Sequence, residues 1–356
     1  MYIGRILKGM CWGWLFMVTA ACSKDVVTGG GNSDGTPLVT LHIGTPPSGE
    51  VEYTRGTQDV SEITINTLTV YDFLVREHSD GADTLIAGMQ YLLKEEGTGT
   101  PKPGCFISSA GGATATLSIS AEMESKHVFV CVANEGKLHF DSIMQPGVTP
   151  IDSLRKLPAT RRLKHGESAA KLIETGAVMT GMTKPVVITA NPAYNIQLYR
   201  IMARLDVKNN VPAINNFRLI NVSAENCAAT GFLFGQRSDK SFTAEKVDYS
   251  ALVSQNRNMA VDEELKALAT GNTCGKVLYL YEHRTDSCGT STPVPALLVT
   301  YTLNGSPKTV RVPMTTSGEI RFDIKRNRLY TLVVGDDGSP ASTRIVCSVK
   351  EEGKKE

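Results

Sequence analysis

The sequence predicts an all-β fold made of two tandem β-sandwich domains. Short apolar runs rich in Val, Ile and Thr recur along the chain, and several alternate with polar residues. Turn residues separate these runs, with 32 Gly and 16 Pro in the chain. The length of 356 residues corresponds to two domains at roughly 100–200 residues each. We place the first sandwich at 38–192 and the second at 193–349.

The charge balance argues against a nucleic-acid partner. The chain has 37 Lys and Arg and 36 Asp and Glu, so neither sign is in excess to attract nucleic acid or an anionic surface. Hydrophobic residues make up 41% of the chain and charged residues 21%, which is typical of a globular protein. We therefore expect a folded protein with no nucleic acid among its partners.

Residues 1–21 have the features of a bacterial secretory leader. Arg5 and Lys8 provide the positive start, and an apolar run follows at 10–20. That run has the length of a signal-peptide core and is shorter than the ~20 residues needed to cross a bilayer. Small residues stand directly before Cys22, as in the lipobox of lipoproteins, where the Cys is acylated and becomes the mature N-terminus. An ordinary signal peptide followed by a chance cysteine is the alternative.

A tether and one clear strand follow the leader. Residues 22–37 are rich in Gly, so we expect a flexible segment that separates the body from the membrane. The strand at 38–44 alternates, with Val39, Leu41 and Ile43 on one face and polar residues on the other. This pattern predicts a half-buried strand whose apolar row faces the core.

A polar loop is expected next, at 45–61. It opens with Gly and Pro residues, which end the strand, and it contains Arg55 followed by Gly56. A protease needs an exposed, flexible bond, and this loop offers one at Arg55. The alternative is that Arg55 is an ordinary loop residue. Arg76 is a poorer candidate, because it ends a long apolar strand.

The rest of the chain continues as short strands between turns. Two short helices are expected at 150–157 and 261–268. The further strands are expected at 63–75, 85–93, 115–120, 127–133, 186–189, 196–207, 217–222, 232–234, 277–282, 297–303, 309–313, 321–324, 329–334 and 345–349.

The cysteines of the body permit disulfides, because an exported chain passes through an oxidising route. Cys274 and Cys288 flank a strand-like segment and form the favoured pair. Cys131 and Cys347 lie in apolar strands, where a buried thiol is the commoner outcome. The sequence does not select among the pairings of Cys105, Cys131, Cys227, Cys274, Cys288 and Cys347.

The usual motifs of enzyme and cofactor sites are missing from the sequence. It has no phosphate-binding loop, no H-E-x-x-H, no C-x-x-C and no G-x-S-x-G. The 6 His residues are scattered singly, and the Asp residues next to Gly fit turns better than a calcium loop. We therefore expect no catalytic residues, no metal and no cofactor. Arg200 and Arg204 are expected to be structural, either facing outward or forming interdomain ion pairs.

Several segments together resemble the type V pilin, or fimbrillin, family of Bacteroidales-type bacteria. The chain carries them in the family's order over almost its whole length. They are the lipobox leader that ends at Cys22, the loop motif Thr54-Arg55-Gly56, the strand at 62–73, the R-x-x-A-R-x-D segment at 200–207, the Y-x-x-E strand at 278–282 and the R-N-x-x-Y segment at 325–330.

The resemblance implies two transthyretin-like sandwiches, no catalytic activity and assembly by strand exchange. In this family a lipid-anchored precursor reaches the outer membrane, where an Arg-specific extracellular protease cuts the N-terminal loop. The first strand leaves with the lipid, and its groove accepts the C-terminal strand of a neighbouring subunit in the extracellular fimbrium. For this chain the resemblance implies lipid on Cys22, a cut between Arg55 and Gly56, and release of the strand at 38–44.

The end of the chain departs from the shaft subunits of that family. The last expected strand ends at residue 349, and the polar tail at 350–356 has no apolar residue that could fill a groove. A subunit with a groove and no donor strand would end a polymer, which favours a tip or accessory subunit. The alternatives are a shaft subunit that donates 344–349, an anchor that keeps its lipid, and a surface lipoprotein that binds a glycan or a host protein.

Overall fold

The computed structural model describes the chain in separate stretches. The leader, Cys22 and the loop with Arg55 and Gly56 lie outside them, so lipidation and cleavage stay predictions. The described residues are 38–45, 60–75, 84–92, 105–111, 114–135, 145–155, 157–159, 169–213, 216–234, 253–254, 266–282, 295–314, 324–336 and 345–351.

The first half of the chain forms two sheets with a shared apolar layer. Its strands are β1 (Leu38–Gly44), β2 (Thr67–Val75), β3 (Thr84–Leu92), β4 (Cys105–Gly111), β5 (Thr114–Ser120), β6 (Lys126–Ala133), β7 (Met179–Met182), β8 (Val186–Val187), β9 (Ala193–Gln197) and β10 (Tyr199–Arg200). One sheet has the order β4-β5-β1-β9, and the other has the order β10-β7-β6-β2-β3, with β8 beside β6.

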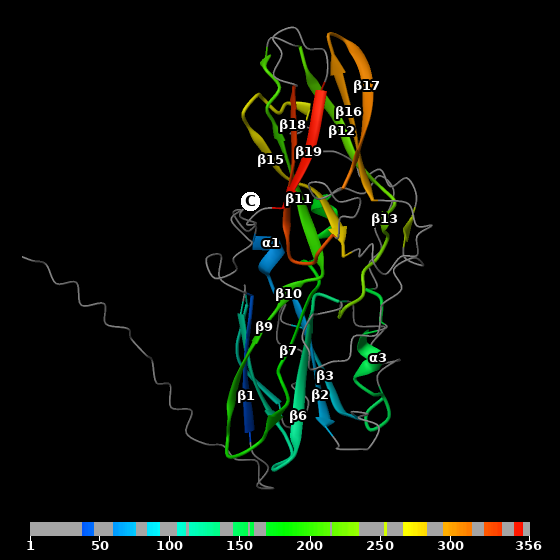
Figure 1. Cartoon of the computed structure of the whole chain (residues 1–356). Coiled ribbons are helices and arrows are strands. Elements are labelled where there is room, and N and C mark those ends of the chain that lie inside the picture. The colour runs from blue at the N-terminus through cyan, green and yellow to red at the C-terminus, as the bar shows by residue number, and fades with distance from the viewer. Residues whose placement is uncertain are drawn as a thin grey trace, which may run out of the picture.

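The second half forms a four-stranded sheet, a three-stranded sheet and a two-stranded pair. Its strands are β11 (Met202–Asn209), β12 (Arg218–Glu225), β13 (Cys227–Ala228), β14 (Val253–Ser254), β15 (Thr273–Tyr281), β16 (Ala296–Leu303), β17 (Ser306–Pro313), β18 (Leu329–Asp336) and β19 (Ile345–Glu351). The sheet orders are β15-β11-β18-β19 and β12-β16-β17, and β13 pairs with β14. The two halves are stacked end to end along the long axis of the molecule (Figure 1).

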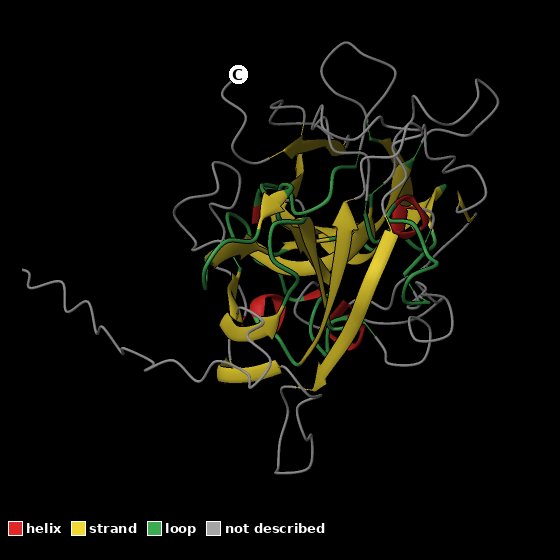
Figure 2. Ribbon diagram, turned by 90° about the horizontal axis from the view of Figure 1, so that it is seen from below, coloured by secondary structure: helices red, strands yellow, loops and turns green. Residues whose placement is uncertain are grey.

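Helices contribute little to the described chain. Each is a single turn: α1 (Val60–Ile63), α3 (Asp152–Arg155) and α4 (Ala169–Leu172). Strands dominate the view from below as well (Figure 2). The all-β prediction is therefore confirmed, and α3 confirms the short helix expected at 150–157.

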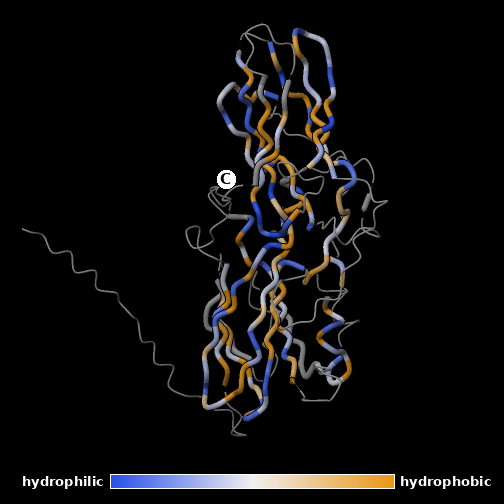
Figure 3. Tube along the Cα trace, viewed as in Figure 1, coloured by the Kyte–Doolittle hydropathy of each residue, from blue (hydrophilic) through white to orange (hydrophobic). Residues whose placement is uncertain are grey.

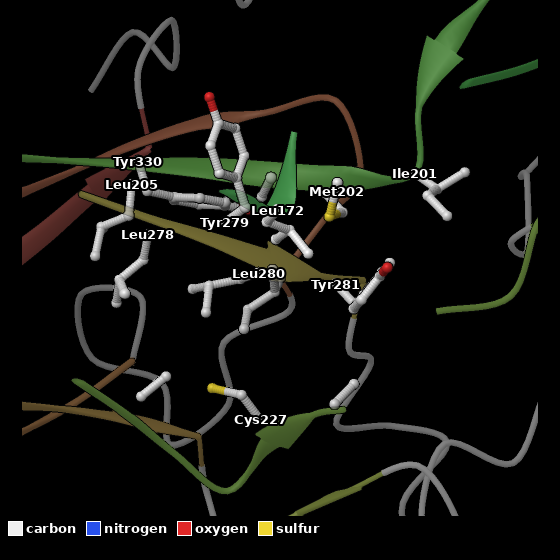
Figure 4. Close-up of a cluster of buried hydrophobic side chains, with 14 of the residues drawn as sticks. Leu172, Ile201, Met202, Leu205, Cys227, Leu278, Tyr279, Leu280, Tyr281 and Tyr330 are labelled. Carbon is white, nitrogen blue, oxygen red and sulfur yellow. The ribbon is translucent and has the colours of Figure 1, made fainter. Parts of the chain in front are cut away.

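Alternation of apolar and polar residues explains how the sheets pack. In β5, Ala115, Leu117 and Ile119 are buried, whereas the residues between them are half-buried. The same alternation of hydropathy runs along strands of both halves (Figure 3). In the second half, Leu205 of β11 and Leu278 of β15 belong to one buried cluster (Figure 4). Full burial of one such side chain is worth about 1.5–3 kcal/mol, so these layers hold the sheets together.

The strand expected at 63–75 starts later than the sequence pattern suggests. Its regular pairing begins at Thr67, and the residues before it turn into α1. The cause is the side chain of Asn134, whose oxygen accepts hydrogen bonds from the amides of Asn66 at 2.8 Å and Thr67 at 3.3 Å. Its amide group donates to the carbonyl of Thr64, so one polar side chain fixes this bend.

Strand pairing changes partners a few residues after the expected boundary at 193. β9 pairs in parallel with β1, and β10 pairs with β7, so both belong to the sheets of the first half. The first strand to pair with second-half strands is β11. The stretch expected as one strand at 196–207 is therefore parts of three strands, each in a different sheet.

Two expectations in the second half also need correction. Residues 232–234 form a loop with one isolated bridge between Phe232 and Pro158 in place of a regular strand. The expected polar tail begins later, because Lys350 and Glu351 still pair with Thr331 and Tyr330 of β18. Backbone pairing does not require apolar side chains, which explains why the strand continues into a charged sequence.

Candidate functional site

β1 is the first strand of the described residues, yet it lies inside its sheet. It pairs antiparallel with β5 along its whole length and parallel with β9 from Thr40 to Gly44. Hydrogen bonds also hold both ends: Leu38 donates to the side chain of Asn191 at 3.1 Å, and the amide of Leu198 donates to the carbonyl of Gly44 at 2.8 Å. The strand is therefore held by two ladders.

The apolar row of β1 is buried, as its sequence pattern predicts. Val39, Leu41 and Ile43 are 0%, 0% and 2% exposed. They belong to one apolar cluster with Leu117 of β5 and Phe129 of β6, so β1 fills the space between the two sheets of the first half. The structure places these three residues as expected, whereas the release of the strand stays a prediction.

A hollow of about 300 Å³ lies beside the last residues of β1. Gly44 has no side chain between its neighbours Thr114 in β5 and Gln197 in β9. The hollow is also lined by His42, whose Nδ1 lies 3.4 Å from the hydroxyl of Thr116. A glycine within a strand weakens it, so the end of β1 that adjoins the expected cleavage loop is its weaker end.

A buried histidine–aspartate pair lies in the same half. The ring of His127 in β6 is fully buried, its Nδ1 is 2.8 Å from a carboxylate oxygen of Asp72, and its Nε2 is 2.9 Å from the carbonyl oxygen of Glu122. Both neighbours are acceptors, which favours the imidazolium form with two donors. Burial alone would lower the pKa of His127. The hydrogen bond and charge of Asp72 and the contact with Glu122 raise the pKa by more than burial lowers it, so the net pKa lies above the ordinary histidine value.

Two cysteines with free thiols lie in strands of different halves of the molecule. Cys131 in β6 is a buried free thiol in the apolar cluster that holds the row of β1. Cys347 in β19 is a half-buried free thiol. Burial raises the pKa of Cys131 far above its usual range and that of Cys347 to about 11, so Cys131 is unreactive in place and the half-buried Cys347 reacts slowly. Both match the expectation of strand cysteines without disulfides, and the favoured pair of Cys274 with Cys288 lies partly outside the described residues.

A buried charge cluster joins the two halves at Glu62 of α1. The Glu62 side chain is fully buried, and its carboxylate lies 2.8 Å from the guanidinium of Arg200 and 3.5 Å from that of Arg204. The hydroxyl of Tyr279 in β15 donates to the other carboxylate oxygen. Because burial and the charge of Glu62 both disfavour the phenolate, the pKa of Tyr279 is raised above its ordinary value.

The arginines of this cluster have further partners on the second half. Arg204 binds Asp206 with two hydrogen bonds, of 2.7 and 2.9 Å. A side chain at Gly275 would have its Cβ 2.9 Å from the guanidinium of Arg204, so the close approach needs a glycine there. The Nε of Arg200 donates to Asn327 at 3.1 Å. Each buried charge therefore has a partner, which is the condition for a stable buried ion pair.

A second group of polar contacts lies at the same junction between the two halves. Arg326 pairs with Glu282 at 2.6 Å and donates to the carbonyls of Phe232 and Leu233. Leu233 in turn accepts a hydrogen bond from the hydroxyl of Thr180, on β7 of the first half. The expected motif segments at 200–207, 278–282 and 325–330 thus meet at one place, although they are far apart in the sequence.

The structure places Arg204 in an ion pair between the two halves, with Glu62, whereas the pair of Arg200 with Glu62 lies within the first half, because β10 belongs to its sheets. Both side chains are buried, so the outward-facing alternative is wrong. Glu62 and Tyr279 lie within the segments that carry the resemblance, but sequence reasoning gave neither of them a role. Glu62 stands among polar residues such as Ser61 and Thr64, so the sequence carries no signal that its charge is buried and paired. Cys22, Arg55 and Gly56 lie outside the described residues.

The described stretches show no ligand set of the usual kinds. Within them, no three His, Cys, Asp or Glu side chains lie close enough to hold a metal ion. No helix in those stretches is both long and apolar enough to cross a membrane.

Comparison with known proteins finds solved structures of similar shape and no matching family. No family model and no curated protein matches the chain. A candidate cell adhesion protein from Bacteroides ovatus is 10% identical, with 90% of this chain and 99% of that chain covered at a TM-score of 0.44. A candidate adhesin from Bacteroides ovatus is 10% identical, with 89% and 95% covered at a TM-score of 0.43. A candidate polysaccharide-binding protein from Bacteroides thetaiotaomicron is 12% identical, with 88% and 98% covered at a TM-score of 0.38. TM-scores below 0.5 do not establish a shared function, so function is inferred below from the chain's own residues.

Proposed function

We propose that this chain is a structural and adhesive fimbrial subunit that assembles by protease-triggered strand exchange. The place of β1 supports this most: the first strand of the described residues is inserted between β5 and β9. Residues 45–59 connect β1 to α1. A cut within them would leave β1 attached to the body only by hydrogen bonds and packing.

Removal of β1 would open a groove of the shape of one strand. β5 and β9 would each lose a ladder, and the apolar cluster would lose Val39, Leu41 and Ile43. Unpaired strand edges are templates for another strand, and each buried aliphatic side chain is worth about 1.5–3 kcal/mol. A strand from a neighbouring subunit with apolar residues at alternate positions would satisfy both needs.

The proposed order of events starts at the outer membrane. The acyl chains on Cys22 would anchor the precursor there. An Arg-specific extracellular protease would cut after Arg55, and β1 would leave with the lipid and the tether. The body, starting at Gly56, would then join other fimbrial subunits as part of the extracellular fimbrium.

Within a fimbrium we propose a tip or accessory position. β19 pairs with β18 as far as Glu351 and packs Cys347 and Val349 against its own core. The residues after Glu351 contain nothing apolar. Because β19 completes a sheet of its own subunit, we propose that this chain accepts a strand at the β1 groove and keeps β19 in place.

One observation favours a shaft position as the second candidate. β19 stands at the end of its sheet, and within the described part of the chain its ladder partner is β18. Moving β19 to a neighbour would break one ladder, whereas moving β1 breaks two.

Limited digestion of residues 23–356 by an Arg-specific protease tests the proposal. We expect denaturing mass spectrometry to find one early product that begins at Gly56, and native separation to show that the fragment with β1 has left. The variant Arg55→Ala is the control and should stay intact. Cleavage at many sites, or a cut fragment that stays bound even when a β1-competing strand is added, would contradict the proposal. Mixing the cut body with a shaft subunit then separates tip from shaft, since a tip subunit ends the polymer.

A further inference from the structure

We infer that Glu62 couples the two halves into one cooperative unit, and that this coupling does not use β1. Glu62 belongs to α1, which leads into β2 of the first half. Its partners are Arg200 at the end of β10, Arg204 of β11 and Tyr279 of β15. One side chain from the first half therefore contacts β11 and its neighbour β15 in a second-half sheet.

The charge balance explains why Glu62 is decisive for this contact. Two carboxylates, Glu62 and Asp206, face two guanidiniums, Arg200 and Arg204. If Glu62 loses its charge, two buried cations remain opposite one anion. Separation of the halves would let water reach the arginines, so the joined state would lose more stability than the separated state.

The contacts of β1 are made elsewhere. Its ladders run to β5 and β9, and its apolar row lies in the cluster of the first sandwich. The partners described for Glu62 lie on β10, β11 and β15. Displacement of β1 should therefore leave the junction closed, and this consequence rests on the proposed function.

Hydrogen exchange of the uncut chain in increasing urea tests the coupling. Peptides from β6 report on the first half, and peptides from β16 report on the second. In the unaltered protein both should lose protection at the same urea concentration. In Glu62→Gln the two midpoints should separate by at least about 0.5 M, given typical slopes of 1–3 kcal/mol per molar urea. Glu62→Asp, which keeps the charge on a shorter side chain, should separate them less and serves if Glu62→Gln does not fold.

Two controls separate coupling from general destabilisation. Glu225→Gln removes a carboxylate from another ion pair, with Arg311 at 2.5 Å, between β12 and β17 of the second half. Leu41→Ala weakens β1 alone. Both should shift the two midpoints together and keep them coincident.

The inference is wrong if Glu62→Gln and Glu62→Asp keep coincident midpoints, or if Leu41→Ala separates them. All of these measurements use the uncut chain, so they decide on Glu62 even if the protease releases no strand. Hydrogen exchange of the cut body then tests the consequence: its midpoints should still coincide, and separated midpoints would show that the coupling passes through β1.

Discussion

β1 and β19, the first and last strands of the described chain, differ in how their sheets hold them. Both alternate apolar and polar residues for part of their length. β1 lies between two partner strands and buries its apolar row completely. β19 lies at the end of its sheet, and its residues Cys347 and Val349 are half-buried.

The difference shows what each strand can do. Loss of β1 would leave two unpaired edges and an apolar groove, so it needs a trigger and a replacement. Loss of β19 would move the edge of the sheet to β18 and expose less apolar surface. Similar sequence patterns therefore give one strand that closes a groove and one that could leave at lower cost.

The largest expected effect is that of truncating the central residue of β1. Leu41→Ala should lower the free energy of unfolding by about 2–5 kcal/mol, because the fully buried site has no room to collapse between two sheets. Urea unfolding of the uncut chain, followed by circular dichroism, measures this. The neighbouring variant Thr40→Ala faces outward and should cost much less; equal costs for the two would contradict the described orientation of β1.

The next largest effect is a pH dependence of the stability of the first half, the half that contains β1. The pKa of His127 is higher in the folded than in the unfolded chain, so its pair with Asp72 stabilises the fold. This contribution is complete below about pH 6.5, the ordinary histidine pKa, and is lost as the pH rises through the higher pKa of the folded state. The urea midpoint should therefore fall between pH 6 and 9. His127→Gln should flatten this slope, and the exposed His42→Gln should keep it; a slope that persists without His127 would assign it to other groups.

Truncation in β19 should cost less than truncation in β1. Val349→Ala removes two methyl groups at a half-buried position, which is worth about 1 kcal/mol or less. The exposed neighbour Ser348→Ala is the control and should be close to neutral. A cost for Val349→Ala as large as that for Leu41→Ala would show that β19 is held as firmly as β1 and would weaken the shaft alternative.

The smallest effect concerns the weaker end of β1. Gly44→Thr should fill part of the hollow between Thr114 and Gln197 and remove the penalty of a glycine in a strand, about 0.5–1 kcal/mol. After cleavage, the fragment with β1 should then leave roughly two- to five-fold more slowly, as measured by native separation over time. The rate of the cut itself should not change. Faster release would show that Gly44 is needed for the pairing.

Local patterns explain which parts of the fold were predictable. The prediction of a strand at 38–44 matches the bounds of β1, because alternating residues and a Gly-Pro break coincide there. The start of β2 was not, since the side chain of Asn134 bends the chain from a distant part of the sequence. The same limit applies to Glu62, whose partner Arg204 is 142 residues away. The polar residues around Glu62 do not indicate that its charge is buried, and no local pattern indicates which distant residue pairs with it.

The labelling of Cys131 before and after cleavage tests the central claim most directly. Cys131 lies in the apolar cluster beneath β1, and Cys347 on β19 is the internal reference. Before the cut, an alkylating reagent at pH 8 should modify Cys347 first and leave Cys131 almost untouched. After the cut and the loss of β1, modification of Cys131 should speed up by at least about tenfold, as expected for a thiol that local opening exposes, while that of Cys347 stays the same. If Cys131 remains as slow after the cut as before, no groove has opened and strand exchange at β1 is contradicted.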